Sequence, residues 1–287
     1  MNMLIRSPGP VLKWPGAKWS SQVAPTIIGH FPAHRCYLSL FFGSGGDLFN
    51  KAPAACEVVN DLDDDIVNFF EVLRDDQDAL ARAVSLTPWS RTEWERAHRH
   101  AEDLTKLERA RRFIARMNQS YGQRPGCTGW RHDGPARASS FTLQWRGLPD
   151  RIVIAAERLR YVQIECRPWH DILSRYAGAD VLVFADPPYL GETRKRRRIY
   201  RIEMMSPVEH EQLLVALRAH PGPVAITHYR CPLYDALLSD WVVIEIAAIA
   251  EHGQRRVEGL YLNPELVRRL QAGRGQRDLF DMFGGPA

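Results

Sequence analysis

Short runs of apolar residues recur along the chain, and each run ends in a polar or glycine-rich turn. The runs are rich in Val and Ile and do not alternate strictly with polar residues, which is typical of strands buried on both faces of a parallel or mixed sheet. Seven strands are predicted, at residues 36–41, 56–59, 161–166, 181–185, 223–229, 241–249 and 257–263.

Helical patterns lie between these runs. Residues 65–76 carry apolar side chains at helical spacing. Residues 206–220 begin with Ser206, Pro207 and Glu209, which suit a helix cap, a helix-start proline and a first-turn acid. The alternation of strands and helices predicts an α/β fold, with ligands bound at the carboxyl ends of the strands.

Residues 89–150 break this alternation, because they contain no convincing strand pattern. A long helix is expected to begin at Ser90, where Glu93 completes a capping-box spacing, and to run to Gln119. Arginine is abundant here, and its planar fork matches phosphate oxygens. A charge run by itself, however, favours a solvated helix face. Residues 109–151 hold Asp133 and Asp150 against Arg109, Arg111, Arg112, Arg116, Arg124, Arg131, Arg137, Arg146 and Arg151.

The composition of the whole chain is that of an ordinary globular protein. Its 287 residues are 45% hydrophobic and 25% charged, enough for a substantial core in one large domain or two small ones. No apolar run approaches the roughly 18 residues of a membrane span, and no secretory signal is visible. We therefore expect a soluble, cytoplasmic protein without a membrane partner. The five widely spaced cysteines argue against a disulfide framework or a metal site.

Two candidate ligand-binding features follow the first two predicted strands. The turn FGSGGD, with Gly43 and Gly45, allows the backbone to approach a ligand closely, although such turns also occur for structural reasons. Asp61 follows the next strand, where an acid commonly accepts the hydroxyls of a ribose. The alternative for the acids here is capping of the following helix, which suits Asp64 or Asp65 best.

The predicted strand at residues 181–185 ends in Asp186, Pro187, Pro188 and Tyr189. Both prolines fix the backbone and donate no hydrogen bond, so the local backbone offers carbonyl oxygens. That arrangement suits a substrate group that is itself a donor, such as an exocyclic amine, and Tyr189 offers a flat face to the ring that bears it. A run of five cations follows at residues 194–198.

These motifs resemble the Dam-like DNA adenine N6-methyltransferases. The resemblance is carried by DPPY, by the earlier FGSGG and KWPGAK segments, by RFIARMNQSYG at residues 112–122, and by VEGLYLN near the end. It implies a Rossmann-type S-adenosylmethionine (SAM)-dependent sheet with an inserted, mainly helical DNA-recognition module. The implied division is a SAM-binding part at residues 1–88, the target-recognition module at 89–151, the DPPY part of the catalytic domain at 152–265 and a flexible tail at 266–287.

The resemblance also implies the site. Trp14 and Lys18 are expected near SAM, Gly43 and Gly45 beneath it, and Asp61 on its ribose. Asp171 is expected at the SAM adenine, with a structural helix cap as the equal alternative. The residues expected to bind double-stranded DNA are Arg112, Arg116, Asn118, Arg194, Lys195 and Arg196.

The implied reaction is methyl transfer to N6 of an adenine that is flipped out of the duplex. Tyr189 would stack on the base, while the Asp186 carboxylate and the Pro187 carbonyl accept the two N6 hydrogens. No metal is needed. The chain departs from the family in having Asp61-Leu62-Asp63 in place of Asp-x-Asn, and less glycine in WPGAK. Residues 122–150 match nothing, so the DNA sequence recognised is not readable.

Three alternatives remain open at this stage. The substrate could be an RNA adenine or the N4 of cytosine in DNA, although Asp at the first DPPY position leans toward adenine. The chain could also be a non-catalytic DNA-binding protein on the same fold, which the intact motifs argue against.

The tail carries one further motif. QRDLF, with Gln276, Leu279 and Phe280, resembles the peptide by which bacterial replication proteins engage the sliding clamp. The alternative is a helical turn that docks on the protein's own surface. A partner of this kind implies a bacterial or phage-encoded protein that acts on DNA.

Overall fold

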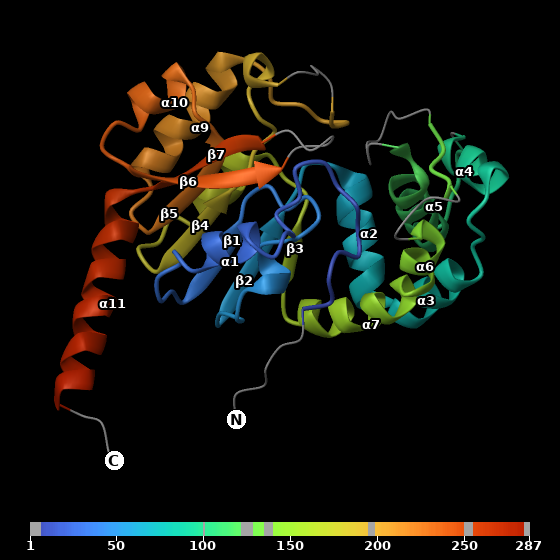
Figure 1. The fold of residues 1–287 in the computed structure, drawn as a ribbon, viewed down its shortest axis with the longest axis horizontal. Coiled ribbons are helices and arrows are strands. Elements are labelled where there is room, and N and C mark those ends of the chain that lie inside the picture. The colour runs from blue at the N-terminus through green and yellow to red at the C-terminus, as the bar shows by residue number, and fades with distance from the viewer. Residues whose placement is uncertain are drawn as a thin grey trace.

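The structure, a computed structural model, describes residues 7–99, 101–121, 129–134, 140–194, 199–249 and 255–283. Its centre is a seven-stranded sheet in the order β3-β2-β1-β4-β5-β7-β6 (Figure 1). All seven predicted strands are present, several of them shorter than predicted. They are β1 (Cys36–Ser39), β2 (Cys56–Asn60), β3 (Gln163–Glu165), β4 (Val181–Ala185), β5 (Val224–Tyr229), β6 (Val242–Ile249) and β7 (Arg255–Leu262).

The order of the strands fixes where a ligand can bind. β1 pairs in parallel with β2 on one side and with β4 on the other. The chain therefore passes from β1 to β2 on one side and later returns to β4 on the other side of β1. The strand order reverses between β1 and β4, which makes these two strands the switch point of a Rossmann-type sheet. The glycine turn after β1 and the DPPY motif after β4 meet at this point. β7 is antiparallel to both β5 and β6.

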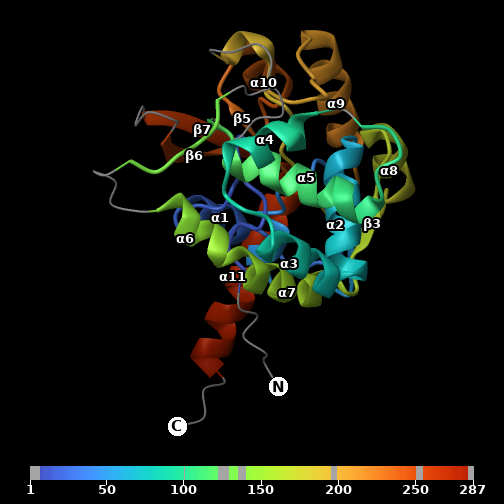
Figure 2. The ribbon, with the colours of Figure 1, turned by 90° about the vertical axis from the view of Figure 1, so that its right-hand side faces the viewer.

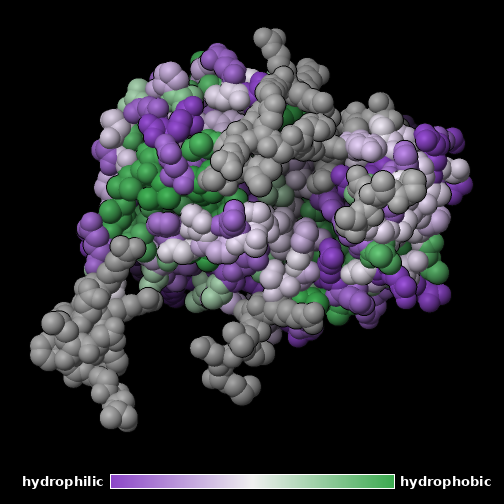
Figure 3. All heavy atoms as spheres, viewed as in Figure 1, coloured by the Kyte–Doolittle hydropathy of each residue, from purple (hydrophilic) through white to green (hydrophobic). Residues whose placement is uncertain are grey.

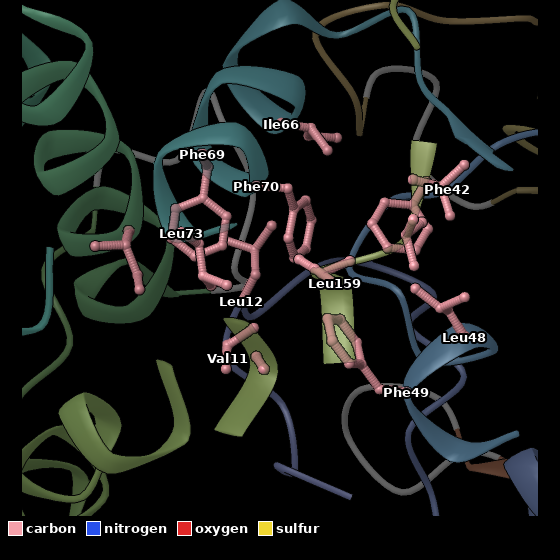
Figure 4. Packing of buried hydrophobic residues seen from close by; sticks show 14 of the residues in the cluster. Val11, Leu12, Phe42, Leu48, Phe49, Ile66, Phe69, Phe70, Leu73 and Leu159 are labelled. Atoms are coloured by element: carbon pink, nitrogen blue, oxygen red, sulfur yellow. The ribbon is translucent and has the colours of Figure 1, made fainter. Parts of the chain in front are cut away.

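Helices cover both faces of the sheet. On one face α1 (Val23–Ile28) and α2 (Asp64–Asp75) pack with Phe42, Phe49 and Phe70, and Figure 4 shows these three rings close together. The Phe42 and Phe70 ring centroids are 4.8 Å apart. α8 (Trp169–Arg175), α9 (Pro207–Ala219) and α10 (Pro232–Leu237) contribute to the core on the other face. The capping box predicted for α9 is present between Ser206 and Glu209.

A helical lobe stands beside α2, at the right of Figure 1 and facing the viewer in Figure 2. It consists of α3 (Gln77–Ser85), α4 (Arg91–His98), α5 (Lys106–Gln119), α6 (Phe141–Arg146) and α7 (Leu148–Leu159). Within residues 89–151, the described residues form no strand beyond one isolated bridge between Ser120 and Trp130. The predicted module boundary at residues 151 and 152 falls inside α7.

The single helix predicted from Ser90 to Gln119 is wrong, because two helices occupy this interval. Ser90 caps α4 as predicted, with its side chain accepting the Glu93 N–H. The first helix ends at His98, and Asp103 then adopts a left-handed φ of 64°. Thr105 accepts the Glu108 N–H and starts α5 as a new helix.

The tail predicted from residue 266 begins as a helix, because α11 spans Pro264–Phe283. Asn263 Oδ1 accepts the Leu266 N–H at 2.9 Å, and Leu266 is fully buried, so the helix is anchored where it begins. Glu265 pairs with Arg268 and Arg269 along its first turns. Figures 1 and 2 show α11 leading away from the body of the protein.

β6 is the edge strand of the sheet on this side. Figure 3 shows apolar side chains gathered over the part of the molecule that contains β6, and Val242 at the start of this strand is 43% exposed. Among the described residues, no helix has the length and apolar character to cross a membrane.

Candidate active site

A cavity of about 330 Å³ opens at the carboxyl ends of β1 and β4. The turn after β1, the segment around Trp14 and Lys18, the end of β2 and the DPPY strand all contribute to its wall. Acids outnumber bases in this wall, although Asp63 and Glu203 are each paired with an arginine that offsets part of the excess. The remaining negative charge makes the cavity suitable for a cationic ligand. The acidic and basic residues that line it are Lys18, Asp47, Asp61, Asp63, His170, Asp186, Glu203 and Glu209.

The glycine turn has one residue at the cavity and one in the core. Gly43 lines the cavity, has a φ of 53°, and donates its N–H to Asp61 Oδ2 at 2.8 Å. Gly45 has a φ of 74°, and a Cβ there would lie 2.7 Å from the rings of Phe42 and Phe49. The sequence predicted Gly45 beneath the cofactor, but Gly45 does not line the cavity and instead allows the two rings to pack closely. Gly46 lines the cavity in its place.

Asp61 lies at the cavity wall, and its carboxylate is held by two backbone N–H groups. Oδ2 accepts from Gly43 and Oδ1 accepts from Asp63 at 2.9 Å. Burial raises the pKa of Asp61 to about 6, although these N–H groups oppose the change. The sequence favoured Asp64 or Asp65 as the cap of α2, but the cap is Asp63, whose side chain accepts the Asp65 N–H.

Asp186 stands at the end of β4 with both of its contacts on one oxygen. Lys18 Nζ lies 3.0 Å from Oδ1, and the Thr227 hydroxyl donates to the same oxygen at 2.6 Å. Among the described residues, no donor reaches Oδ2. The carboxylate is therefore fixed in orientation and keeps one oxygen for an incoming donor.

Lys18 lines the cavity as predicted, but its ammonium is turned to Asp186. It also donates to the Gly16 carbonyl at 2.9 Å and to the Tyr189 hydroxyl at 3.1 Å. Glu258 Oε2 lies 3.5 Å away. Burial lowers the pKa of this lysine, but the charges of Asp186 and Glu258 outweigh burial and raise it above its usual value.

The rest of DPPY is tightly packed. Pro188 lines the cavity, whereas the Tyr189 ring is 9% exposed and lies 4.8 Å from the rings of both His228 and Tyr229. His228 Nε2 accepts the Leu190 N–H at 2.9 Å, and its Nδ1 contacts the Tyr229 carbonyl at 2.7 Å. Burial lowers the pKa of His228 to about 3. The neutral ring therefore anchors the backbone that follows DPPY.

The segment after the basic run lies against the cavity. Tyr200 lines it, with its ring 5.8 Å from that of Trp14 and its hydroxyl donating to Pro15. Arg201 pairs with Asp63 at 2.7 Å and also contacts Asp64. These contacts join the segment to both walls of the cavity.

Arg194 is not on a DNA-facing surface, contrary to the prediction. Its side chain is 4% exposed and pairs at 2.8 Å with Glu203, which lines the cavity. Lys195 and Arg196, the neighbouring predicted DNA contacts, lie outside the described residues.

The three predicted DNA contacts on α5 have partners within the protein. Arg112 pairs with Glu108 at 2.7 Å, and Arg116 pairs with Asp65 at 3.2 Å. Asn118 is buried and donates to the Ile114 carbonyl of its own helix. The burial of Asn118 removes it from a DNA-facing surface.

Asp171 is exposed on α8 and does not line the cavity, although it was predicted at the cofactor. The residues just before it, Pro168, Trp169 and His170, line the cavity instead. Gln276, Leu279 and Phe280 fall in the last turns of α11, where side chains lie outside the described residues. Within the described residues, no group of three or more His, Cys, Asp or Glu side chains is arranged to hold a metal ion.

Sequence reasoning missed Thr227 and Glu258, the two residues that complete the surroundings of Lys18 and Asp186. Glu258 had a visible signal, since it is an acid within the apolar run VEGLYLN. Thr227 had none, because threonine is common in strands for reasons of packing.

A family model described as D12 class N6 adenine-specific DNA methyltransferase matches residues 14–251. The match includes the Trp14 segment, the glycine turn, Asp61 and DPPY, which are the elements that meet at the cavity. No curated protein matches the chain. The chain belongs to the D12 class of DNA methyltransferases, enzymes that methylate N6 of adenine in DNA.

Proposed function

We propose that the chain transfers a methyl group from SAM to N6 of an adenine flipped out of duplex DNA. The observation that carries the proposal is the state of Asp186. Its Oδ1 is held by Lys18 and Thr227 at the cavity, and Oδ2 has no donor among the described residues. An adenine amino group supplies the donor that such an oxygen lacks.

The cavity wall supports SAM as the methyl donor. The excess of acids suits the sulfonium and ammonium charges of SAM, and Asp61, which lines the cavity, would accept its ribose hydroxyls. Trp14, Gly43 and Asp61 would hold the cofactor, with Trp169 in the place that the sequence assigned to Asp171. When bound, SAM supplies an activated methyl group, so the chain's own task is positioning and electrostatics.

Asp186 and the Pro187 carbonyl would accept the two N6 hydrogens and aim the nitrogen lone pair at the methyl group. Flipping the adenine costs about a few kcal/mol in lost pairing and stacking. Tyr189 would return part of this through its ring. Because Tyr189 is already packed against His228 and Tyr229, its orientation is set before the base arrives.

For DNA contacts we propose Lys195 and Arg196, together with the helical lobe as the target-recognition unit. The lobe contains the predicted module, residues 89–151, and in addition α3 and the part of α7 after residue 151. To bind phosphate, Arg112 and Arg116 would have to give up their ion pairs with Glu108 and Asp65. Their net contribution to the free energy of DNA binding is therefore reduced. Asn118 and Arg194 are left out of this proposal because both are buried.

The test is transfer of labelled methyl from SAM to duplex DNA, single-stranded DNA and RNA, followed by mass spectrometry of the modified nucleoside. We expect N6-methyladenine in the duplex, and loss of at least about a thousandfold in rate for Asp186→Asn. The control is Asp240→Asn, an exposed acid. Methylcytosine, preferred RNA methylation or an active Asp186→Asn would each contradict the proposal.

We also propose that Gln276, Leu279 and Phe280 engage a bacterial sliding clamp in the cytoplasm. The support is the QRDLF motif and the direction of α11, which carries it away from the body (Figure 1). A second contact on the same DNA would raise the local enzyme concentration. Titrating the full chain with purified clamp should give saturable binding that is lost in Leu279→Ala/Phe280→Ala. Equal binding of that variant would contradict the proposal.

A further inference from the structure

Lys18 contacts a second carboxylate besides that of Asp186, and this one is buried. Glu258 lies on β7, is 7% exposed, and places Oε2 3.5 Å from Lys18 Nζ. Its position is set by strand pairing on both sides, opposite Tyr229 of β5 and Ile246 of β6. It lies outside residues 14–251, so the family match assigns it no role.

The hydrogen bonds of Lys18 show what kind of contact this is. Two N–H donors of its ammonium group go to the Gly16 carbonyl and the Tyr189 hydroxyl, and the nearest carboxylate oxygen is Asp186 Oδ1 at 3.0 Å. Glu258 Oε2 is buried and has no hydrogen-bond partner among the described residues. A buried anion in that state depends on the charge of its neighbour. Glu258 therefore interacts with Lys18 through charge.

The summed charge of Lys18, Asp186 and Glu258 indicates what the contact does. Lys18 and Asp186 alone would form a neutral pair, and the lysine would weaken the carboxylate as an acceptor. Glu258 adds a second negative charge, so that the three groups together carry −1 in a buried setting, where charges act strongly. During methyl transfer positive charge moves onto N6, beside Asp186. A net negative cluster stabilises that change more than it stabilises the resting amine.

We propose that Glu258 is a positioning residue that holds Lys18 and keeps the cluster anionic, so that Asp186 remains a strong acceptor for N6. In the reaction the bond between sulfur and methyl breaks, the bond between methyl carbon and N6 forms, and the N6 proton passes to Asp186 and then to water. Glu258 exchanges no proton and no atom. The inference rests on the proposed role of Asp186.

The experiment is a single-turnover methyl-transfer assay of Glu258→Gln on duplex DNA with saturating labelled SAM. We expect the rate to fall about thirtyfold, less than the hundredfold or more that follows loss of a direct contact. The dissociation constants of SAM and DNA should stay within about threefold, because Glu258 acts on a charge that develops only in the transition state. Glu245→Gln, at an exposed position on β6, is the matched control and should keep the wild-type rate.

A double-mutant cycle with Lys18→Met tests the path of the effect. Because Glu258 also holds Lys18 in place, Glu258→Gln should cost less in the Lys18→Met background than in the wild type, where the lysine can be displaced as well. If Glu258→Gln does not fold, Glu258→Asp decides, because it keeps the charge and draws it back from Lys18. We expect that variant to lose about fivefold in rate at unchanged SAM affinity.

A wild-type rate in Glu258→Gln or, where that variant does not fold, in Glu258→Asp would overturn the inference. Additive losses in the cycle would overturn it as well. Asp186→Asn, measured beside these variants, separates the two levels of the argument. If Asp186→Asn is inactive while Glu258→Gln is fully active, only the role of Glu258 fails. If Asp186→Asn is active, the proposed function itself fails.

Discussion

Charged side chains are arranged differently on α5 and around Lys18. On α5, Arg109, Arg111, Arg112 and Arg116 each pair with an acid, and all four side chains keep part of their surface in solvent. Around Lys18, one buried cation is shared by two carboxylates. Partly exposed ion pairs contribute little individually to stability, because solvent screens their charges. A buried group with one cation and two carboxylates keeps a net charge that solvent does not screen. The number of charges in a region is therefore a poor guide to where charge acts.

The largest difference between the two regions should follow removal of the cation from each. Lys18→Met leaves buried Glu258 and half-buried Asp186 without their partner, so we expect a loss of about 3–5 kcal/mol in unfolding free energy. Arg112→Met, the matched change on α5, should cost less than about 1 kcal/mol. Urea unfolding of both variants measures the two values. Equal losses would mean that burial does not separate the regions.

Acidification should have the second largest effect, by lowering the stability of the buried region around His228. The pKa of His228 is lowered to about 3, while an unfolded histidine titrates near 6.5. The unfolded chain therefore binds the extra proton, and stability is lost as pH falls from about 6.5 toward 3. At pH 5 this single group accounts for about 2 kcal/mol. Urea unfolding at pH 7 and pH 5 should show the loss in the wild-type chain.

His228→Asn is the control for that loss, since it should remove this part of the pH dependence even if it lowers stability at pH 7. An unchanged dependence in the variant would assign the effect to other groups, of which buried His210 is one.

Cofactor affinity should depend on pH through Asp61. Its pKa of about 6 means that the carboxylate is lost as pH falls below 6, and a neutral acid is a weaker acceptor for ribose hydroxyls. We expect SAM affinity to fall about tenfold between pH 7 and pH 5, which corresponds to about 1.4 kcal/mol. Calorimetry of SAM binding measures it. In Asp61→Asn the affinity should be low at both values, and a variant that follows the wild-type curve would exclude Asp61.

The smallest effect concerns the basic run. Replacing Lys195 and Arg196 by Gln should reduce the slope of log K for DNA binding against log salt by about 0.9 for each phosphate contact that is lost. Arg194→Gln should leave the slope unchanged, because Arg194 is buried against Glu203. Binding titrations between low and physiological salt give the slopes. A change in Arg194→Gln alone would reverse the assignment.

The sequence was a good guide to the sheet and to the ends of its strands. Short apolar runs that end in polar or glycine-rich turns have few other possible structures, so all seven strands were predicted. DPPY, the glycine turn and Asp61 each follow a strand, and parallel pairing of β1 with β2 and β4 brings them together. Their meeting at one cavity was therefore implied by fold class.

Contacts between distant side chains could not be predicted in this way. Lys18 and Asp186 are far apart in sequence, and nothing local shows that the lysine reaches the carboxylate. Gly45 resembles Gly43 in sequence, but its role in packing depends on the rings of Phe42 and Phe49. The arginines of α5 and Arg194 looked available for phosphate, because their acidic partners on other segments become neighbours only after folding.

The position of β7 has a consequence for the order in which the enzyme is completed. In the described part of the sheet β6 pairs with β7 and with no other strand, and β7 follows β6 along the chain. While the protein is being synthesised, β6 therefore has no edge to join until residues 255–262 have emerged. The same late strand brings Glu258 to Lys18. A nascent chain can thus contain DPPY and the whole glycine turn and still lack a finished active site until β7 has been made.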